Sequence, residues 1–344
     1  MSFDYYDFDH NITYQYINDL IEEYYDDYFE LLLSPSSQKS FGNVTMGLIH
    51  FFLSLFFMIL QILVFTSFYS KRRLFNKPCY EIIFNYGIVS FIQQICHIIT
   101  SIILITYIME IRLVLSFIGT LLTASYIGNM AFILLLTLYN FDIVYNVKFL
   151  NDYLKKIIYL YGIILCYILT VIIFVLLLLL SQCKKNFNFF SFRWVNCGLN
   201  LNKESNKFEK YFTFPLLSGS LILQVLTFTK ILFLRCYASK KTIFATDELK
   251  IILHTFLCFL TISILELTRD KVIFQIFWKK HLKYIPHILF IILSVSNSLF
   301  VLCFVREIRI NMAFYKFFKG NGNVVISNGS IKTIHKVNVV RSVT

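Results

Sequence analysis

Charged side chains are scarce in this sequence of 344 residues: Asp, Glu, Lys and Arg together make up 15% of it. A soluble domain usually carries about 25% charged residues, because its surface faces water. Hydrophobic residues make up 57% of the chain, and its mean hydropathy is +0.67. The shortage of charge therefore argues against a soluble protein and favours a chain whose solvent is lipid.

Sequence motifs of common enzymes are also missing. The chain has no phosphate-binding Gly-rich loop, no Gly-x-Ser-x-Gly, no His-Glu-x-x-His and no Cys-x-x-Cys. His97 and His254 are isolated histidines in different apolar segments, so no spacing indicates a metal site. We expect no enzymatic activity, no cofactor and no bound metal.

The net charge of +12 raises the question of a nucleic-acid partner. A phosphate-binding surface needs Lys and Arg gathered on one folded face. Here the basic residues form short clusters between long apolar runs, as they do beside membrane spans. The charge pattern predicts contact with lipid and no binding of nucleic acid.

Long apolar runs dominate what the sequence does contain. A helix needs about 20 mostly apolar residues to cross the hydrocarbon core of a bilayer. Seven segments meet this need: 46–70, 80–106, 113–139, 157–181, 211–234, 250–268 and 284–305. They predict an all-α membrane protein with a bundle of seven transmembrane helices, because membrane β-strands would be shorter and alternating.

Basic residues near the first spans predict the orientation. The loop after the first span carries Lys71, Arg72, Arg73 and Lys77, whereas the N-terminal tail offers only Lys39. Because cytoplasmic loops are enriched in Lys and Arg, we expect the N-terminus outside and the C-terminus in the cytoplasm. The first 40 residues are acidic and lack the apolar core of a signal peptide, so the first span is expected to direct its own insertion.

Three regions follow from these predictions: an acidic extracellular tail over 1–45, a transmembrane domain over 46–305 and a cytoplasmic segment over 306–344. Asn11 and Asn43 begin Asn-x-Thr sequons in the tail and are candidate glycosylation sites. Basic and apolar residues mix between Arg306 and Lys319, which favours a short helix on the inner membrane surface. We expect a multi-pass protein of the plasma membrane.

Polar side chains inside the spans are the candidate ligand-binding residues, because such groups usually face the interior of a bundle. In the second span, Ser90, Gln93, His97, Thr100 and Ser101 share one helical face. Further candidates are Ser125, Asn129, Glu266 and Asn297. Two simpler interpretations stay open: Gln93 and His97 bond only between helices, and Glu266 pairs locally with Arg269 or Lys271.

Two short motifs resemble nematode serpentine chemoreceptors, class T in particular. The second span opens Cys-Tyr-Glu-Ile-Ile-Phe-Asn-Tyr-Gly-Ile over 79–88, similar to the family's Cys-Tyr-Lys-Ile-Met-Phe-x-Leu-Gly-Ile. The seventh ends Phe-Val-Arg-Glu-Ile-Arg over 304–309, similar to Leu-Asn-x-Thr-Ile-Arg. The resemblance implies a G-protein-coupled receptor for an external chemical, with a heterotrimeric G protein as its cytoplasmic partner.

The resemblance also assigns cytoplasmic coupling residues: Asn140, Phe141, Asp142, Arg306 and Arg309. Related receptors end the third span with Leu-Asn-Arg, whereas this chain has Phe141 at the arginine position. It has Ser90 where the family usually has an acid, and Asn-Ser-Leu-Phe-Val over 297–301 where many receptors have Asn-Pro-x-x-Tyr. These departures put conventional G-protein coupling in question.

Cysteine usage departs from related receptors as well. No cysteine lies between Thr106 and Ser116, where many of them anchor a disulfide to the next outer loop. Cys183 and Cys197 both fall in the predicted outer loop, where the compartment is oxidising. They form either a bridge within that loop or two free thiols.

The sequence as a whole favours a chemosensory seven-helix receptor. A secondary transporter is one alternative, although no internal repeat is visible and the two prolines within spans, Pro215 and Pro286, lie near the predicted outer ends. A ligand-gated channel of the insect-receptor type is another, and it would have the opposite orientation.

Overall fold

The computed structural model describes residues 36–70, 77–106, 112–145, 152–179, 185–188, 193–196, 202–237, 246–269 and 285–311. Six helices in these ranges are long and apolar enough to cross a membrane, and a bent helix pair makes a seventh span if the pair is counted as one. The chain is therefore a multi-pass membrane protein. A bundle of up to seven spans agrees with the sequence prediction.

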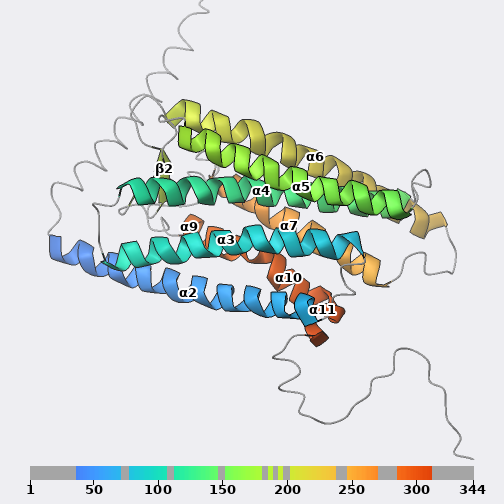
Figure 1. The fold of residues 1–344 in the computed structure, drawn as a ribbon, viewed down its shortest axis with the longest axis horizontal. Helices are drawn as coiled ribbons and strands as arrows, with labels where there is room; N and C mark the ends of the chain where they lie inside the picture. Colours follow the sequence, from blue (N-terminus) through green and yellow to red (C-terminus); the bar gives the residue numbers. More distant parts are fainter. Residues whose placement is uncertain are drawn as a thin grey trace, which may run out of the picture.

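The helices run back and forth along one long axis (Figure 1). They are α2 (Ser36–Ser70), α3 (Pro78–Thr106), α4 (Arg112–Tyr145), α5 (Asp152–Leu179), α6 (Asn202–Tyr237), α7 (Thr246–Arg269), α9 (Ile285–Ser294), α10 (Ser296–Phe304) and α11 (Arg306–Asn311). Two antiparallel strands, β1 (Lys185–Asn188) and β2 (Arg193–Asn196), form a hairpin at one end. We call this the hairpin end and the opposite one the α11 end.

Helix boundaries follow local chemistry where the sequence supplies a signal. α3 begins at Pro78, whose fixed φ and missing N–H suit the first position of a helix. α5 begins at Asp152, a residue type favoured at the start of a helix because the helix dipole is positive there. α4 continues to Tyr145, six residues beyond the predicted span, because polar residues can extend a helix after its apolar run has ended. Asn140, Phe141 and Asp142 are therefore helical.

The region between α5 and α6 differs from the loop expected over 182–210. The hairpin occupies part of it, with Phe187 opposite Trp194. α6 then begins at Asn202, nine residues before the predicted start of its span, because the charged residues from Lys203 to Lys210 already belong to the helix. The predicted all-α fold therefore also contains this short β-hairpin.

The predicted seventh span is not one straight helix. α9 and α10 meet at Val295 with a bend of 47°. Neither glycine nor proline is present in the Ser294-Val295-Ser296 segment, so the usual sequence signals for a kink are missing. α11 follows directly and packs against α2, and Ile308 is fully buried there.

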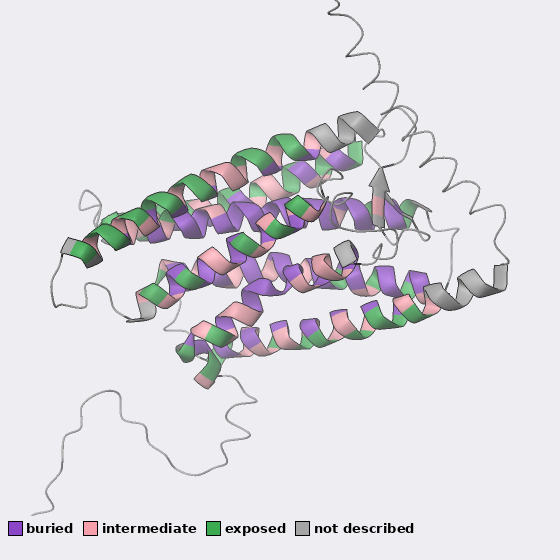
Figure 2. Ribbon diagram, turned by 180° about the vertical axis from the view of Figure 1, so that it is seen from behind, coloured by how far each residue is buried: buried purple, intermediate pink, exposed green. Residues whose placement is uncertain are grey.

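α4 is the central helix of the bundle. It packs against α3, α5, α6, α7 and β1. In its most apolar stretch 83% of the residues are buried, against 22% in α5 and in α6. Figure 2 shows the same contrast, because the central helix is buried along most of its length while outer helices expose one face. Exposed Leu, Ile and Phe side chains on those outer faces suit lipid as the surrounding solvent.

Candidate functional site

The predicted polar face of α3 does point into the bundle. Ser90, Gln93, His97, Thr100 and Ser101 are all 1–2% exposed. A helix places residues three, four and seven positions apart on one side, and here that side contacts α4 at Ser90 and Gln93 and α9 at His97. The helical spacing of these polar residues therefore predicted correctly that this side of α3 is buried.

Asn129 joins α4 to this face. Its Nδ2 donates to Gln93 Oε1 at 2.9 Å and to Ser90 Oγ at 3.3 Å. Three of the predicted pocket residues therefore form one buried cluster between two helices. Gln93 Nε2 and Asn129 Oδ1 remain without a hydrogen-bond partner, so the cluster keeps one donor and one acceptor for a further polar group.

Ser125 lies one turn before Asn129 on α4 and is equally buried. Its hydroxyl donates to the carbonyl of Leu121 at 2.7 Å, within its own helix. The structure therefore places Ser125 beside the cluster but satisfies its hydroxyl locally. It offers a matched comparison with Asn129.

A second polar layer surrounds the bend between α9 and α10. The N–H of Val295 donates to the carbonyl of Ile292 at 3.2 Å, a tighter turn than the α-helical pattern. The carbonyl of Ile291 instead accepts from Ser294 Oγ at 2.7 Å and from Gln94 Nε2 of α3 at 3.4 Å. In a membrane such side-chain donors satisfy backbone groups that a broken helix releases.

Asn297 belongs to this second layer and not with Ser90. Its Oδ1 lies 3.1 Å from His254 Nε2 of α7, and its Nδ2 donates to the carbonyl of Ile83 at 3.2 Å. Its Nδ2 also lies 3.6 Å from where a Cβ on Gly87 would be, and Gly87 is three residues, about one helical turn, before Ser90. Gln61 of α2 bonds to Ser298 in the same layer. Four helices are thus linked around the bend.

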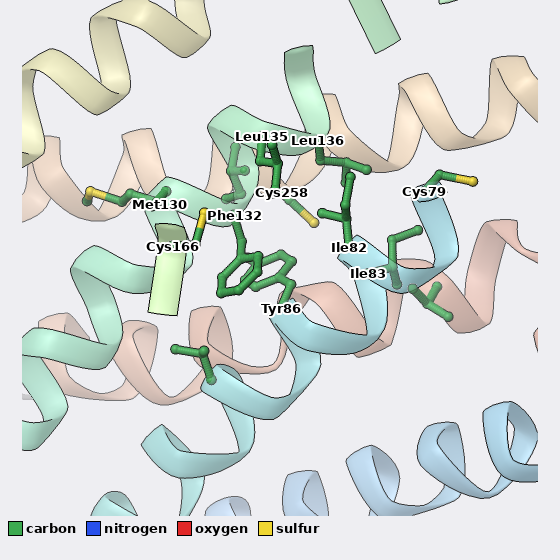
Figure 3. Packing of buried hydrophobic residues seen from close by; sticks show 14 of the residues in the cluster. Cys79, Ile82, Ile83, Tyr86, Met130, Phe132, Leu135, Leu136, Cys166 and Cys258 are labelled. Carbon is green, nitrogen blue, oxygen red and sulfur yellow. The ribbon is translucent and has the colours of Figure 1, made fainter. Parts of the chain in front are cut away.

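Aromatic and sulfur-containing side chains pack beside this layer. Figure 3 shows Tyr86 of α3 pointing toward Phe132 of α4, with Cys258 of α7 and Cys166 of α5 close by. Tyr86 is 1% exposed and belongs to the largest hydrophobic cluster of the bundle. The opening motif of α3 is buried on the same side: Cys79, Tyr80, Ile82, Ile83, Tyr86 and Gly87. Packing therefore accounts for much of that motif.

Glu266 lies toward the hairpin end of α7. Its Oε1 accepts a hydrogen bond from the hydroxyl of Tyr126 at 2.6 Å, which joins α7 to α4. The side chains of Arg269 and Lys271 lie outside the described residues. The predicted local ion pair therefore stays a prediction beside the observed bond to Tyr126.

Sequence reasoning missed two residues near His97. His50 of α2 and His287 of α9 have ring centroids 4.4 Å apart, and the His97 and His287 centroids are 5.6 Å apart. The ring of Phe187 in the hairpin packs against the His287 ring, with 5.4 Å between the ring centroids. No sequence spacing links residues this far apart, so the signal lies only in the fold. Within the described residues no group of three His, Cys, Asp or Glu is placed to hold a metal ion.

The predicted coupling residues gather at the α11 end. Asn140 Nδ2 donates to Thr255 Oγ1 at 2.8 Å, between α4 and α7. Asp142 forms an ion pair with Lys155 at 3.2 Å and accepts from Tyr159 at 3.3 Å, both on α5. Phe141 stacks on Tyr145 with centroids 4.3 Å apart. These contacts hold the end of α4 in place.

Arg309 caps the last turn of α10, because its guanidinium donates to the carbonyls of Leu302 and Cys303 at 3.3 Å each. Arg306 is exposed. A cavity of about 10 Å³ lies between α4, α6 and α7. Its lining includes Asn140, Gln224 and Thr255, and both amide atoms of Gln224 are buried without a hydrogen-bond partner.

Several predictions from the sequence fall outside what is described. Asn11, Cys183 and Cys197 lie outside the described residues, as does the chain after Asn311. Asn43 lies within α2, one residue before the apolar span Val44–Ser70, and its side chain is not described. The proposed glycosylation and disulfide bridge stay predictions.

Comparison with known proteins adds no assignment. No protein-family model matches the chain, and no curated protein matches it.

Proposed function

We propose that the protein is a seven-helix receptor that binds an external small molecule and signals to a cytoplasmic protein. One observation carries the proposal: α4 is bonded to α3 through Asn129 and to α7 through Asn140, so one buried helix connects two polar clusters along the bundle. A ligand that favours one packing of α4 can shift the population of the other cluster. The resemblance of the motifs at 79–88 and 304–309 to nematode serpentine receptors supports the same function.

The ligand site belongs at the cluster of Ser90, Gln93 and Asn129. These side chains carry the free donor of Gln93 and the free acceptor of Asn129, which a small polar ligand can engage. The plasma membrane is the expected location, with the hairpin end outside, as the basic residues after the first span indicate. The α11 end then faces the cytoplasm and presents Asp142, Arg306 and the cavity beside Asn140.

Expression of the full chain in cultured cells, followed by a chemical library, tests the receptor proposal. Second-messenger output and membrane current are recorded together, because a current alone would indicate a channel. For a responding compound, Asn129→Leu should raise the half-maximal concentration about tenfold, the equivalent of one lost hydrogen bond. Ser125→Ala should leave it unchanged. Equal effects of the two substitutions would argue against this ligand site.

A heterotrimeric G protein is the proposed partner at the α11 end. Phe141 occupies the position at which related receptors have arginine, and it stacks on Tyr145. Phe141→Arg should therefore increase messenger output if that position limits coupling. Unchanged output with normal surface expression would remove Phe141 from the coupling face.

The bend at Val295 favours a second candidate, a secondary transporter. Transporters often place their substrate beside a broken helix near the middle of the membrane. Here the broken helix is lined by Gln61, Gln94 and His254. Uptake of a labelled compound that elicits no messenger response would select this function over the receptor.

A further inference from the structure

Three histidine side chains from three helices meet inside the bundle near its hairpin end. His50 of α2, His97 of α3 and His287 of α9 are 1%, 1% and 5% exposed. The His287 ring contacts both of the others, at centroid distances of 4.4 and 5.6 Å. We call these three residues the histidine cluster.

Ring nitrogens in the histidine cluster lack hydrogen-bond partners. His50 Nε2 and both nitrogens of His97 are buried without one. A buried polar group without a partner costs about 1–3 kcal/mol, so a cluster of this kind is expensive for stability alone. His254, in the same bundle, reduces this cost through the contact of its Nε2 with Asn297, although its Nδ1 is also buried without a partner.

Aromatic rings enclose the histidine cluster. Phe290 contacts His97 edge-on at 5.1 Å, and Phe187 of the hairpin contacts His287 at 5.4 Å. Phe187 in turn meets Trp194 at 5.2 Å. Phe187 also packs in a buried apolar cluster with Leu115 and Ile118 of α4. The hairpin therefore covers the histidines with an apolar side chain.

Few charged groups face the histidine cluster from the packed elements. The span of α2 and the part of α3 from Ser90 onward carry no Asp, Glu, Lys or Arg, and neither does α9. Glu266 of α7 is connected to the cluster indirectly, because it is bonded to Tyr126, whose ring contacts Phe290. The hairpin itself carries Lys185 and Arg193, and Cys96 lies next to His97 on α3.

We propose that the histidine cluster is a proton-binding site whose protonation releases the hairpin from the bundle. Three neutral imidazoles fit an apolar enclosure, but among the described residues an imidazolium there has no anionic partner, and a second charge on the adjoining ring repels it. Separation of Phe187 from His287 hydrates the charge. The open arrangement therefore binds protons more readily, and acid shifts the population toward it. Because a hydrated imidazole has a pKa of about 6.5, the histidines of the open arrangement take up protons as the pH falls through about 6.5.

Trp194 reports the position of the hairpin. The chain has two tryptophans, so Trp278→Phe leaves Trp194 as the single tryptophan, which is excited selectively at wavelengths that tyrosine does not absorb. Its indole Nε1 is buried without a hydrogen-bond partner in the closed arrangement. In the full chain in lipid nanodiscs, we expect a red shift of its emission on acidification from about pH 8 to pH 5. Emission that does not change over this range would overturn the proposal.

Substitution of His287 is the decisive variant, because this ring contacts both other histidines and Phe187. His287→Leu should abolish the red shift, and His335→Gln, which removes an imidazole from the C-terminal region, should preserve it. A red shift that persists in His287→Leu would also overturn the proposal.

Nitrogen NMR of the unsubstituted chain covers the case in which His287→Leu does not fold. On acidification, the imidazole signals of His50, His97 and His287 should change in the same pH range as the Trp194 emission. Signals that stay in the neutral form through that range would contradict protonation of the cluster. Neither measurement needs a ligand or a messenger, so its outcome is independent of the receptor proposal.

Discussion

Buried histidines in two parts of this bundle differ in their hydrogen bonding: His254 bonds through one ring nitrogen and keeps Nδ1 without a partner, whereas both ring nitrogens of His97 lack one. His254 contacts Asn297 at 3.1 Å in the layer around the bend, where Gln61, Gln94 and Ser298 are bonded as well. His50 and His97, near the hairpin end, keep ring nitrogens without partners among aromatic rings. The first group resembles the interhelical hydrogen bonds that stabilise membrane bundles. The second resembles a site that tolerates a stability cost for another purpose.

Asn297→Leu should have the largest effect on stability, because Asn297 bonds to two other helices. The substitution removes both interhelical bonds of Asn297: His254 Nε2 keeps only its 3.7 Å contact with Cys258 Sγ, and the carbonyl of Ile83 loses its side-chain donor. We expect a loss of about 3 kcal/mol, since an unpaired buried polar group costs about 1–3 kcal/mol. Thermal unfolding in detergent measures it, with Ser125→Ala as a control for loss of a bond within one helix. A loss as small as that of the control would show that the layer is not a stabilising network.

Gly87→Ala should cause the second-largest loss of stability. A Cβ at this position would lie 2.7 Å from Gln61 Nε2 and 3.1 Å from the ring of Phe65, closer than packed atoms allow. We expect a loss of about 2 kcal/mol, because overpacking in a filled core costs about 1–3 kcal/mol. The loss should shrink in a Gln61→Ala background, where the crowding atom is absent. Equal losses in both backgrounds would show that Gln61 is not the obstacle.

Gln94→Leu tests the donor that α3 supplies to the bend. Its Nε2 bonds to the carbonyl of Ile291, but Ser294 Oγ also donates to that carbonyl at 2.7 Å. Since one donor remains, we expect a smaller loss of about 1 kcal/mol. Combination with Ser294→Ala should cost more than the sum of the two single substitutions. If thermal unfolding shows that the loss in the double variant equals the sum of the two single losses, the two donors do not share a role.

The sequence predicted the spans well because lipid demands long apolar helices. It also placed Ser90, Gln93 and His97 on an interior face, since helical periodicity needs only local spacing. Asn129 was chosen for polarity alone; its bonds to α3 show that it faces the interior, and its role in ligand binding stays a prediction. Local rules therefore identify which side of a helix is buried.

Other features depend on contacts between distant parts of the chain. Asn297 was grouped with Ser90, but it contacts α3 at the level of Gly87, about one turn away. The sequence of two helices does not fix their relative axial position. The bend at Val295 has no proline or glycine and depends on side-chain donors, one of them from α3. His50 and His287 lie at opposite ends of the sequence. Only the folded bundle brings them together.

His97→Leu should have the smallest effect on stability, and with the opposite sign. Leucine has nearly the volume of an imidazole, and the substitution removes two unpaired nitrogens from an apolar enclosure. Its benefit is offset in part by the lost edge contact with Phe290, so we expect a gain of up to about 1 kcal/mol. His254→Leu should instead destabilise the bundle, because it deprives Asn297 of a partner. If thermal unfolding shows that His97→Leu lowers stability more than His254→Leu does, the contrast between these histidines is wrong. If it stabilises the chain while weakening the acid response of Trp194, the unpaired nitrogens serve the proton site at the expense of stability.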